Sequence, residues 1–201
     1  MTWITTIAYE NSTGKVRQLY DRIKGPDNNV DNIMMAHSLR PHTMEGHMAI
    51  YKYVIHHPRN TLPKWLLEAV GVYVSLINKC EYCVEHHYAG LQRLLDDDER
   101  AREIRAALEA DEPERAFDGR DLAALLYAAK LTRTPTEITS EDVEALRDAS
   151  LDDGEILEVN QVTAYFSYAN RTVLGLGIST EGDILGLSPS DSENMANWNH
   201  R

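Results

Sequence analysis

Hydrophobic residues recur along most of the chain at the three- and four-residue spacing of a helix face, rather than in the alternation of a half-buried strand. Residues 12–24 are an example, because their apolar positions share one side and Gly25-Pro26 then stops the helix. The same pattern predicts further helices over residues 43–56, 63–79, 80–95, 101–110, 120–132, 141–149 and 153–176. The sequence therefore predicts an all-α protein.

The segment from Pro63 to Lys79 differs from the other predicted helices because it is apolar almost all round. A helix without a polar face is expected to lie buried at the centre of a fold, and Pro63 suits its first turn. Residues 1–185 are expected to form one helical domain, because we find no internal repeat or low-complexity segment in them. The last residues, 186–201, are polar and are expected to be irregular.

Composition and charge narrow the classes of function. The 201 residues are 43% hydrophobic and 26% charged, which is ordinary for a soluble globular protein. Acidic residues outnumber basic ones by 32 to 20, for a formal charge of -12, so a nucleic-acid partner is not expected. The longest apolar run, Leu66–Ile77, is too short to cross a bilayer, and the first residues lack the layout of a secretory signal. We therefore expect a cytoplasmic protein with no membrane partner.

The only two cysteines, Cys80 and Cys83, lie three positions apart in the stretch NKCEYCVEHH. Thiols are kept reduced in the cytoplasm, so a close pair points to a catalytic, redox-sensing or metal-binding role more than to a structural disulfide. With Asn78 as the expected cap, both cysteines fall in or near the first turn of a helix, where the dipole favours a thiolate. Such a pair can lower a thiol pKa from about 8.5 to roughly 3.5–7.5, and neighbours at i and i+3 can close a disulfide.

A histidine shares the face of the two cysteines. On a helix, Cys80, Cys83 and His87 fall within an arc of about 80°, whereas Glu85 and His86 point away from that face. His87 lies one turn after Cys83, close enough to exchange a proton with it directly or through one water. A base in that position activates the thiol and holds it ionised.

Glu68 is the one acidic residue of the apolar segment 63–79. A carboxylate among apolar side chains is costly to bury without a partner. His87 is the candidate partner, because a carboxylate would orient its ring and stabilise its protonated form.

Other interpretations of the cysteine pair are weaker. The pair could be structural or incidental, but the helix start, the histidine on the same face and the glutamate together favour chemistry. A zinc site on Cys80, Cys83 and His87 would need a fourth ligand to close a tetrahedron; His86 faces the wrong way, and no second cluster of cysteine and histidine completes the set. We therefore expect no metal and no cofactor.

The arrangement Glu68-x11-Cys80-x2-Cys83-x3-His87 resembles the signature of the alkylhydroperoxidase D-like proteins, within the carboxymuconolactone decarboxylase superfamily, and is most similar to its peroxidase-related branch. The likeness covers most of the chain, in particular RPHTMEGHMAIYKYVIH, LPKWLLEAVGVYVSLINKCEYCVEHH, LAALLYAAKLTRTPTEITSEDVEALRDASLDDGEIL, AYFSYANRTVLGLGI and GLSPSDSENMANWNH. It implies a helical bundle that assembles into homo-oligomers, typically trimers or hexamers, with the active site buried near subunit contacts.

The resemblance also implies an activity, the reduction of hydrogen peroxide or organic hydroperoxides by a thiol. In family terms Cys83 attacks the peroxide and becomes a sulfenic acid, Cys80 resolves it as a disulfide, and His87 and Glu68 form the proton relay. An external dithiol, such as a lipoyl group, would then reopen the disulfide by thiol exchange. Analogy with thioredoxin would instead make Cys80 the attacking cysteine, so the order of attack stays open.

The chain departs from the family pattern at Tyr82, which stands where well-studied members carry a histidine immediately before the second cysteine. A tyrosine is a poor proton shuttle near neutral pH. The decarboxylase side of the superfamily lacks the cysteine pair, which argues against that chemistry, and Asn170 and Arg171 are expected to serve packing or oligomer contact. Two other functions stay open: a thiol–disulfide oxidoreductase that does not act on peroxide, and a non-catalytic helical oligomer whose cysteine pair senses redox state.

Overall fold

The computed structural model of the protein describes residues 2–189, 194 and 197–201. Every regular element in these ranges is helical, and the one β feature among them is an isolated bridge between Pro189 and His200. The α-helices are α1 (Gly14–Ile23), α2 (Asn32–Met35), α3 (Pro41–Ile55), α4 (Lys64–Ile77), α5 (Glu81–Leu95), α6 (Asp98–Glu109), α7 (Gly119–Arg133), α8 (Ser140–Asp148) and α9 (Asp153–Leu176). Short 3₁₀ turns occupy Tyr9–Asn11, Pro26–Asn28, Pro113–Arg115 and Pro135–Glu137. The all-α prediction is confirmed.

Helices α6 and α9 begin after polar residues whose side chains cap them. Before α9, the Asp152 carboxylate accepts the N–H of Glu155 at 2.8 Å, while the Glu155 carboxylate accepts the N–H of Asp152 at 3.0 Å. This reciprocal pair satisfies two N–H groups that the helix itself leaves without partners. α6 begins earlier than predicted, because the side chain of Asp97 caps it by accepting the N–H of Arg100.

The central helix of the fold is α4, as its apolar pattern predicts. It packs against α5, α7 and α9, and residues 66–74 are all buried. The crossing with α9 is close at Gly71, where an added Cβ would come within 2.2 Å of the Phe166 ring. The small residue therefore lets α9 lie directly against the helix that carries Glu68.

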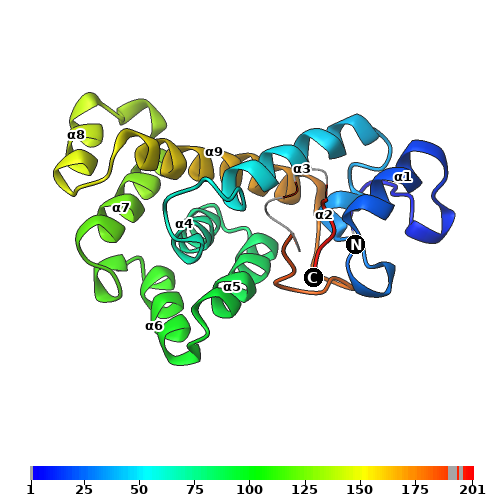
Figure 1. Cartoon of the computed structure of the whole chain (residues 1–201), viewed down its shortest axis with the longest axis horizontal. Helices are drawn as coiled ribbons and strands as arrows, with labels where there is room; N and C mark the ends of the chain where they lie inside the picture. Colours follow the sequence, from blue (N-terminus) through cyan, green and yellow to red (C-terminus); the bar gives the residue numbers. More distant parts are fainter. Residues whose placement is uncertain (1, 190–193, 195–196) are drawn as a thin grey trace.

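The longest helix, α9, runs along the molecule and joins its two ends (Figure 1). Helices α6, α7 and α8 lie at one end, and α1 and α2 lie at the other. α4 and α5 lie between these groups, so the stretch with both cysteines is in the middle of the fold. None of the helices in the described ranges combines the length and apolarity that a membrane span requires.

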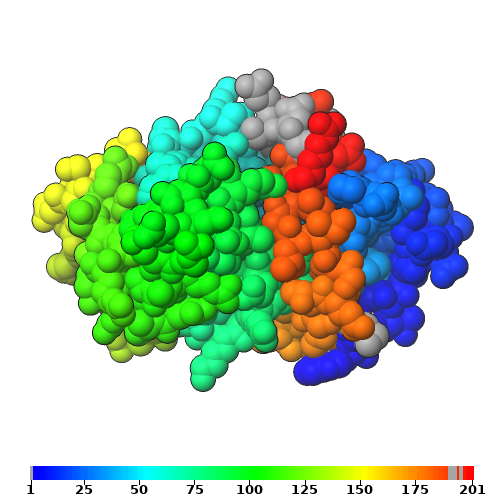
Figure 2. All heavy atoms as spheres, turned by 90° about the horizontal axis from the view of Figure 1, so that it is seen from below, coloured from blue at the N-terminus to red at the C-terminus, as the bar shows by residue number. Residues whose placement is uncertain are grey.

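The residues after α9 return past α5 toward the N-terminal end of the molecule. Figure 2 shows them as an orange-to-red band between the green helices and the blue N-terminal segment. The described residues of the predicted tail, 186–201, carry no helix, and they pack on the helices. Buried Lys52 donates to the carbonyl of Asn194 at 2.7 Å, and His200 is 7% exposed. The rest of the predicted tail, 190–193 and 195–196, lies outside the described residues.

Candidate redox site at the start of helix α5

A tight connection joins α4 to α5 and places the cysteines. Lys79 takes a left-handed backbone conformation (φ 59°), so that Cys80 becomes the N-cap residue of α5 and Cys83 lies in its first turn. The structure corrects the predicted cap. Asn78 keeps helical backbone angles at the end of α4, and its side chain donates to Asn170 of α9 at 2.9 Å.

The two sulfur atoms face each other, 2.8 Å apart, and both cysteines are free. Cys80 is fully enclosed and Cys83 is 3% exposed. Because a disulfide joins sulfurs about 2 Å apart, a small movement closes the bond. Asn170, expected to serve packing or oligomer contact, lies beside the pair, where its side chain hydrogen-bonds the sulfurs and donates to Ser75 at 3.0 Å.

The hydrogen bond between the sulfurs shifts the pKa values of the two thiols in opposite directions. That bond with Cys83 is the main cause that lowers the pKa of Cys80, with smaller contributions from the Cys83 backbone N–H and the Asn170 side chain, while burial opposes them. The same bond with Cys80, together with burial, raises the pKa of Cys83 well above its ordinary value. These directions favour a charge on Cys80, at the positive end of α5, in the singly ionised pair. This differs from the expectation that His87 holds Cys83 ionised.

His87 and Glu68 meet where α5 packs on α4. His87 Nδ1 lies 2.6 Å from Glu68 Oε2, and the Glu68 side chain is 3% exposed. Gly90 leaves room for this carboxylate, because a Cβ added there would come within 3.3 Å of Glu68 Oε1. With Glu68 ionised, the Nδ1–H group donates to it. The ring is then oriented, and Nε2 is the nitrogen that can take up a proton.

A cavity of about 50 Å³ lies beside these groups. Cys83, His87 and Glu68 line it, and other walls come from α2, α3, α9 and the C-terminal residues Leu187 and His200. The described lining does not include Cys80, so Cys83 is the sulfur that a molecule in the cavity meets. A polar space of this size holds a few water molecules or a compact solute.

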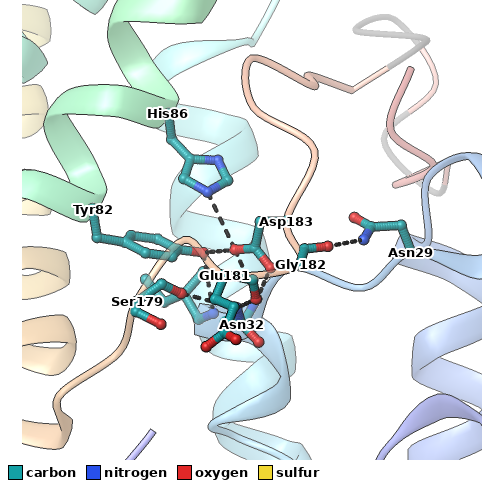
Figure 3. A network of polar contacts seen from close by, with 9 residues as sticks. Asn29, Asn32, Tyr82, His86, Ser179, Glu181, Gly182 and Asp183 are labelled. Atoms are coloured by element: carbon teal, nitrogen blue, oxygen red, sulfur yellow. Dashed lines mark hydrogen bonds and ion pairs between the residues drawn. The ribbon is translucent and has the colours of Figure 1, made fainter. Parts of the chain in front are cut away.

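A second polar group, which the sequence did not reveal, joins Asp183 to Tyr82 and His86 (Figure 3). The Asp183 carboxylate accepts a hydrogen bond from the Tyr82 hydroxyl at 2.7 Å and lies 3.2 Å from His86 Nε2. Tyr82 and His86 both line the cavity. His86, which the sequence places off the face of the two cysteines, therefore still reaches the cavity. The cavity is lined by both histidines and, from the segment after α9, by Leu187 and His200.

Asp31 also lines the cavity. Burial raises the pKa of its carboxyl from 3.8 to about 6; His86 and His87 oppose this effect, and Asp183 adds to it. Since the pKa in the folded state lies above the unfolded value, the stability that protonated Asp31 gives is present below about pH 4. It is lost as the pH rises through about 6.

Replacing Asp31 by asparagine is therefore expected to stabilise the protein at pH 7.5, by about 1–3 kcal/mol, because an ionised carboxylate that is largely shielded from water is removed. At pH 4 the two proteins should unfold at similar urea concentrations. Urea unfolding at both pH values measures the difference. Asp148→Asn, which changes an exposed carboxylate, is the control and should change stability by no more than about 0.5 kcal/mol. An Asp31→Asn protein that is less stable than the wild type at pH 7.5 would contradict the assignment.

The sequence matches a known family over the helices that build this site. Residues 41–134, which run from the start of α3 to the end of α7, match the model of the carboxymuconolactone decarboxylase family. The matched residues include Glu68, Cys80, Cys83 and His87. No curated protein sequence matches the chain.

Solved structures share the fold. An uncharacterized peroxidase-related protein from Silicibacter sp. TM1040 is 29% identical over 75% of this chain and 76% of that chain, with a TM-score of 0.68. An uncharacterized peroxidase-related protein with an alkylhydroperoxidase AhpD core, from Ralstonia eutropha JMP134, is 22% identical over 92% of this chain and 96% of that chain, with a TM-score of 0.76. A variant of the debrominase Bmp8 in complex with 2,3,4-tribromopyrrole is 14% identical over 89% and 93% of the two chains, with a TM-score of 0.69. At these last two identities the likeness shows the fold alone.

Proposed function

We propose that this chain, whose residues 41–134 match the carboxymuconolactone decarboxylase family and whose fold is alkylhydroperoxidase D-like, is a cysteine-based peroxidase. Its substrates would be hydrogen peroxide or organic hydroperoxides. The observation that carries the proposal is the pair of free sulfurs 2.8 Å apart, of which Cys83 lines a cavity that it shares with the His87–Glu68 pair.

In the proposed cycle Cys83 is the attacking cysteine, because it lines the cavity. Its proton passes to His87 Nε2 or to Cys80, and its thiolate attacks the terminal oxygen of ROOH. The S–O bond forms as the O–O bond breaks, which gives Cys83–SOH and RO⁻; the alkoxide then takes a proton and leaves as ROH. The sulfur is oxidised by two electrons and the peroxide is reduced by two.

Cys80 suits the second step of the cycle. Its thiolate attacks the Cys83 sulfur, the S–O bond breaks, and the leaving hydroxide takes a proton to form water. The lowered pKa of Cys80 supports this role, because a resolving thiol must be ionised when it attacks. An external dithiol, for which we expect a lipoyl-type group, then reopens the disulfide and is itself oxidised.

Assembly into homo-oligomers, with trimers or hexamers as the expected forms, stays a prediction.

We expect one equivalent of hydrogen peroxide to convert the reduced protein to a form lighter by two hydrogens, with the change in the peptide that contains both cysteines. Mass spectrometry before and after the reaction measures it, with a sample kept free of peroxide as the control. A protein that exchanges with dithiols and ignores every hydroperoxide would instead be a thiol–disulfide oxidoreductase. Oxidation that changes assembly or melting without any turnover would indicate a redox sensor.

A further inference from the structure

Two neighbouring residues of α5 each pair with a carboxylate beside the same cavity. His87 Nδ1 meets Glu68 of α4, and His86 Nε2 meets Asp183 of the segment after α9. Both rings line the cavity together with Cys83. The proposed reaction has two proton transfers at the peroxide step: one away from the attacking thiol and one to the leaving alkoxide. The His87–Glu68 pair can serve the first of these.

The Asp183 carboxylate is held firmly enough to orient a second ring. Its side chain is 1% exposed, and its oxygens accept the backbone N–H of Asn32 at 3.0 and 3.1 Å. The Asn32 side chain in turn donates to the carbonyls of Ser179 and Glu181, both at 2.9 Å (Figure 3). Because Asp183 is an acceptor at the centre of several donors, His86 Nε2–H donates to it. Nδ1 is then the nitrogen left for exchange.

Tyr82 is better suited to hold this pair in place than to supply the proton. Its hydroxyl donates to Asp183 and accepts the backbone N–H of Ile33 at 3.3 Å, and its ring lies 4.5 Å from the ring of His86. Burial is the main cause that raises the pKa of Tyr82 well above 10, with Asp31 and Asp183 adding to it. A phenol of that kind keeps its proton near neutral pH. His86, at the same wall of the cavity, is the group that can give one up.

We propose that His86 is a second catalytic residue, the proton donor to the leaving alkoxide, and that Asp183 and Tyr82 are its positioning residues. This inference rests on the proposed peroxidase function. When the O–O bond breaks, one oxygen stays on Cys83 and RO⁻ separates from it. Protonated His86 gives its proton to RO⁻, which leaves as ROH. The ring then regains a proton from solvent. Asp183 is its ion-pair partner. The charged and titratable groups that line the same cavity are Asp31, Tyr51, Glu68, Tyr82, Cys83, His87, Arg93, Tyr165 and His200.

The test compares two oxidants whose leaving groups differ in basicity. The tert-butoxide from tert-butyl hydroperoxide is strongly basic and needs a proton, whereas the acetate from peracetic acid leaves without one. For His86→Gln we expect the rate of Cys83 oxidation by tert-butyl hydroperoxide to fall about 100-fold and the rate with peracetic acid to change less than about threefold. Single-turnover quenching followed by mass spectrometry measures both rates. Asp183→Asn should show the same selective loss, because it no longer holds the ring in one tautomer.

Several outcomes decide the proposal. His42→Gln, at an exposed histidine, is the matched control and should leave both rates unchanged. Thermal unfolding checks that each variant folds. Equal losses with the two oxidants, or no loss with either, would overturn the role of His86, since a merely structural effect does not depend on the leaving group. If the wild-type protein reacts with neither oxidant, the peroxidase proposal itself fails, and this inference fails with it.

Discussion

Replacing Cys83 by serine is expected to abolish peroxide consumption and peroxide-dependent disulfide formation. Cys83 is the sulfur that lines the cavity, whereas Cys80 is fully enclosed. A serine hydroxyl is not ionised near neutral pH and is a poor nucleophile toward an O–O bond, so the attacking group is lost while the shape of the site is kept. Peroxide loss from solution, measured in a stopped-flow instrument with a dithiol present, should fall to the uncatalysed rate.

The matched variant is Cys80→Ser. It keeps the attacking sulfur and removes the resolving one, so a single exposure to peroxide should leave a stable sulfenic acid on Cys83. The peptide then gains the mass of one oxygen and reacts with a sulfenic-acid probe. If Cys80 attacks first, as the thioredoxin analogy suggests, the Cys80→Ser protein should lose the reaction with peroxide. The Cys83→Ser protein should then keep a sulfenic acid on Cys80. A Cys83→Ser protein that still consumes peroxide at the normal rate would refute the proposed chemistry.

The short distance between the sulfurs also explains how Cys83 can attack although a charge on Cys80 is favoured at rest. With the sulfurs 2.8 Å apart, the proton of Cys83 needs to move only a short way to ionise the sulfur in the cavity. The lowered pKa of Cys80 suits a resolving thiol, whereas the raised pKa of Cys83 means that its proton must move before it attacks, and Cys80→Ser is the direct check.

The sequence predicts much of this fold because its signals are local. Asp152 and Glu155 cap α9 within three residues of each other, and the absence of a polar face on α4 marks it as the central helix. Glu68 and His87 lie on consecutive helices that a short connection forces to pack together, so their contact could be expected from two positions in the chain. Signals of this kind need no knowledge of distant segments.

The rest depends on contacts between distant parts of the chain. Asp183 is 101 residues from Tyr82, and it belongs to a segment without periodicity, whose path over α5 no local pattern specifies. Asn170 reaches the cysteines only because α9 crosses α4 closely. The predicted cap, Asn78, was wrong for a different reason: asparagine suits both ends of a helix, and the left-handed turn at Lys79 decided which residue caps α5.

Changing Glu68 to glutamine is expected to slow the oxidation of Cys83 by about 100- to 1,000-fold while the protein still folds. The amide keeps the size of the side chain and can still contact His87 Nδ1, but it carries no charge. It can also present its NH₂ group, which would reverse the tautomer of the ring and leave Nε2 with the proton it is meant to accept. Single-turnover oxidation by hydrogen peroxide, followed by mass spectrometry, measures the rate.

Glu85→Gln is the matched control for this variant. Glu85 lies on the same helix as His87 but pairs with Arg105 at 2.5 Å, away from the cysteines, so the rate should stay within about twofold and the stability should fall by at most about 1 kcal/mol. Gly90→Ala gives a graded test, because its Cβ would press on Glu68 Oε1 at 3.3 Å and should cause a smaller loss in the same direction. If Glu68→Gln reacts as fast as Glu85→Gln, the contact with His87 only packs α5 on α4, and the proton of Cys83 must leave by way of Cys80.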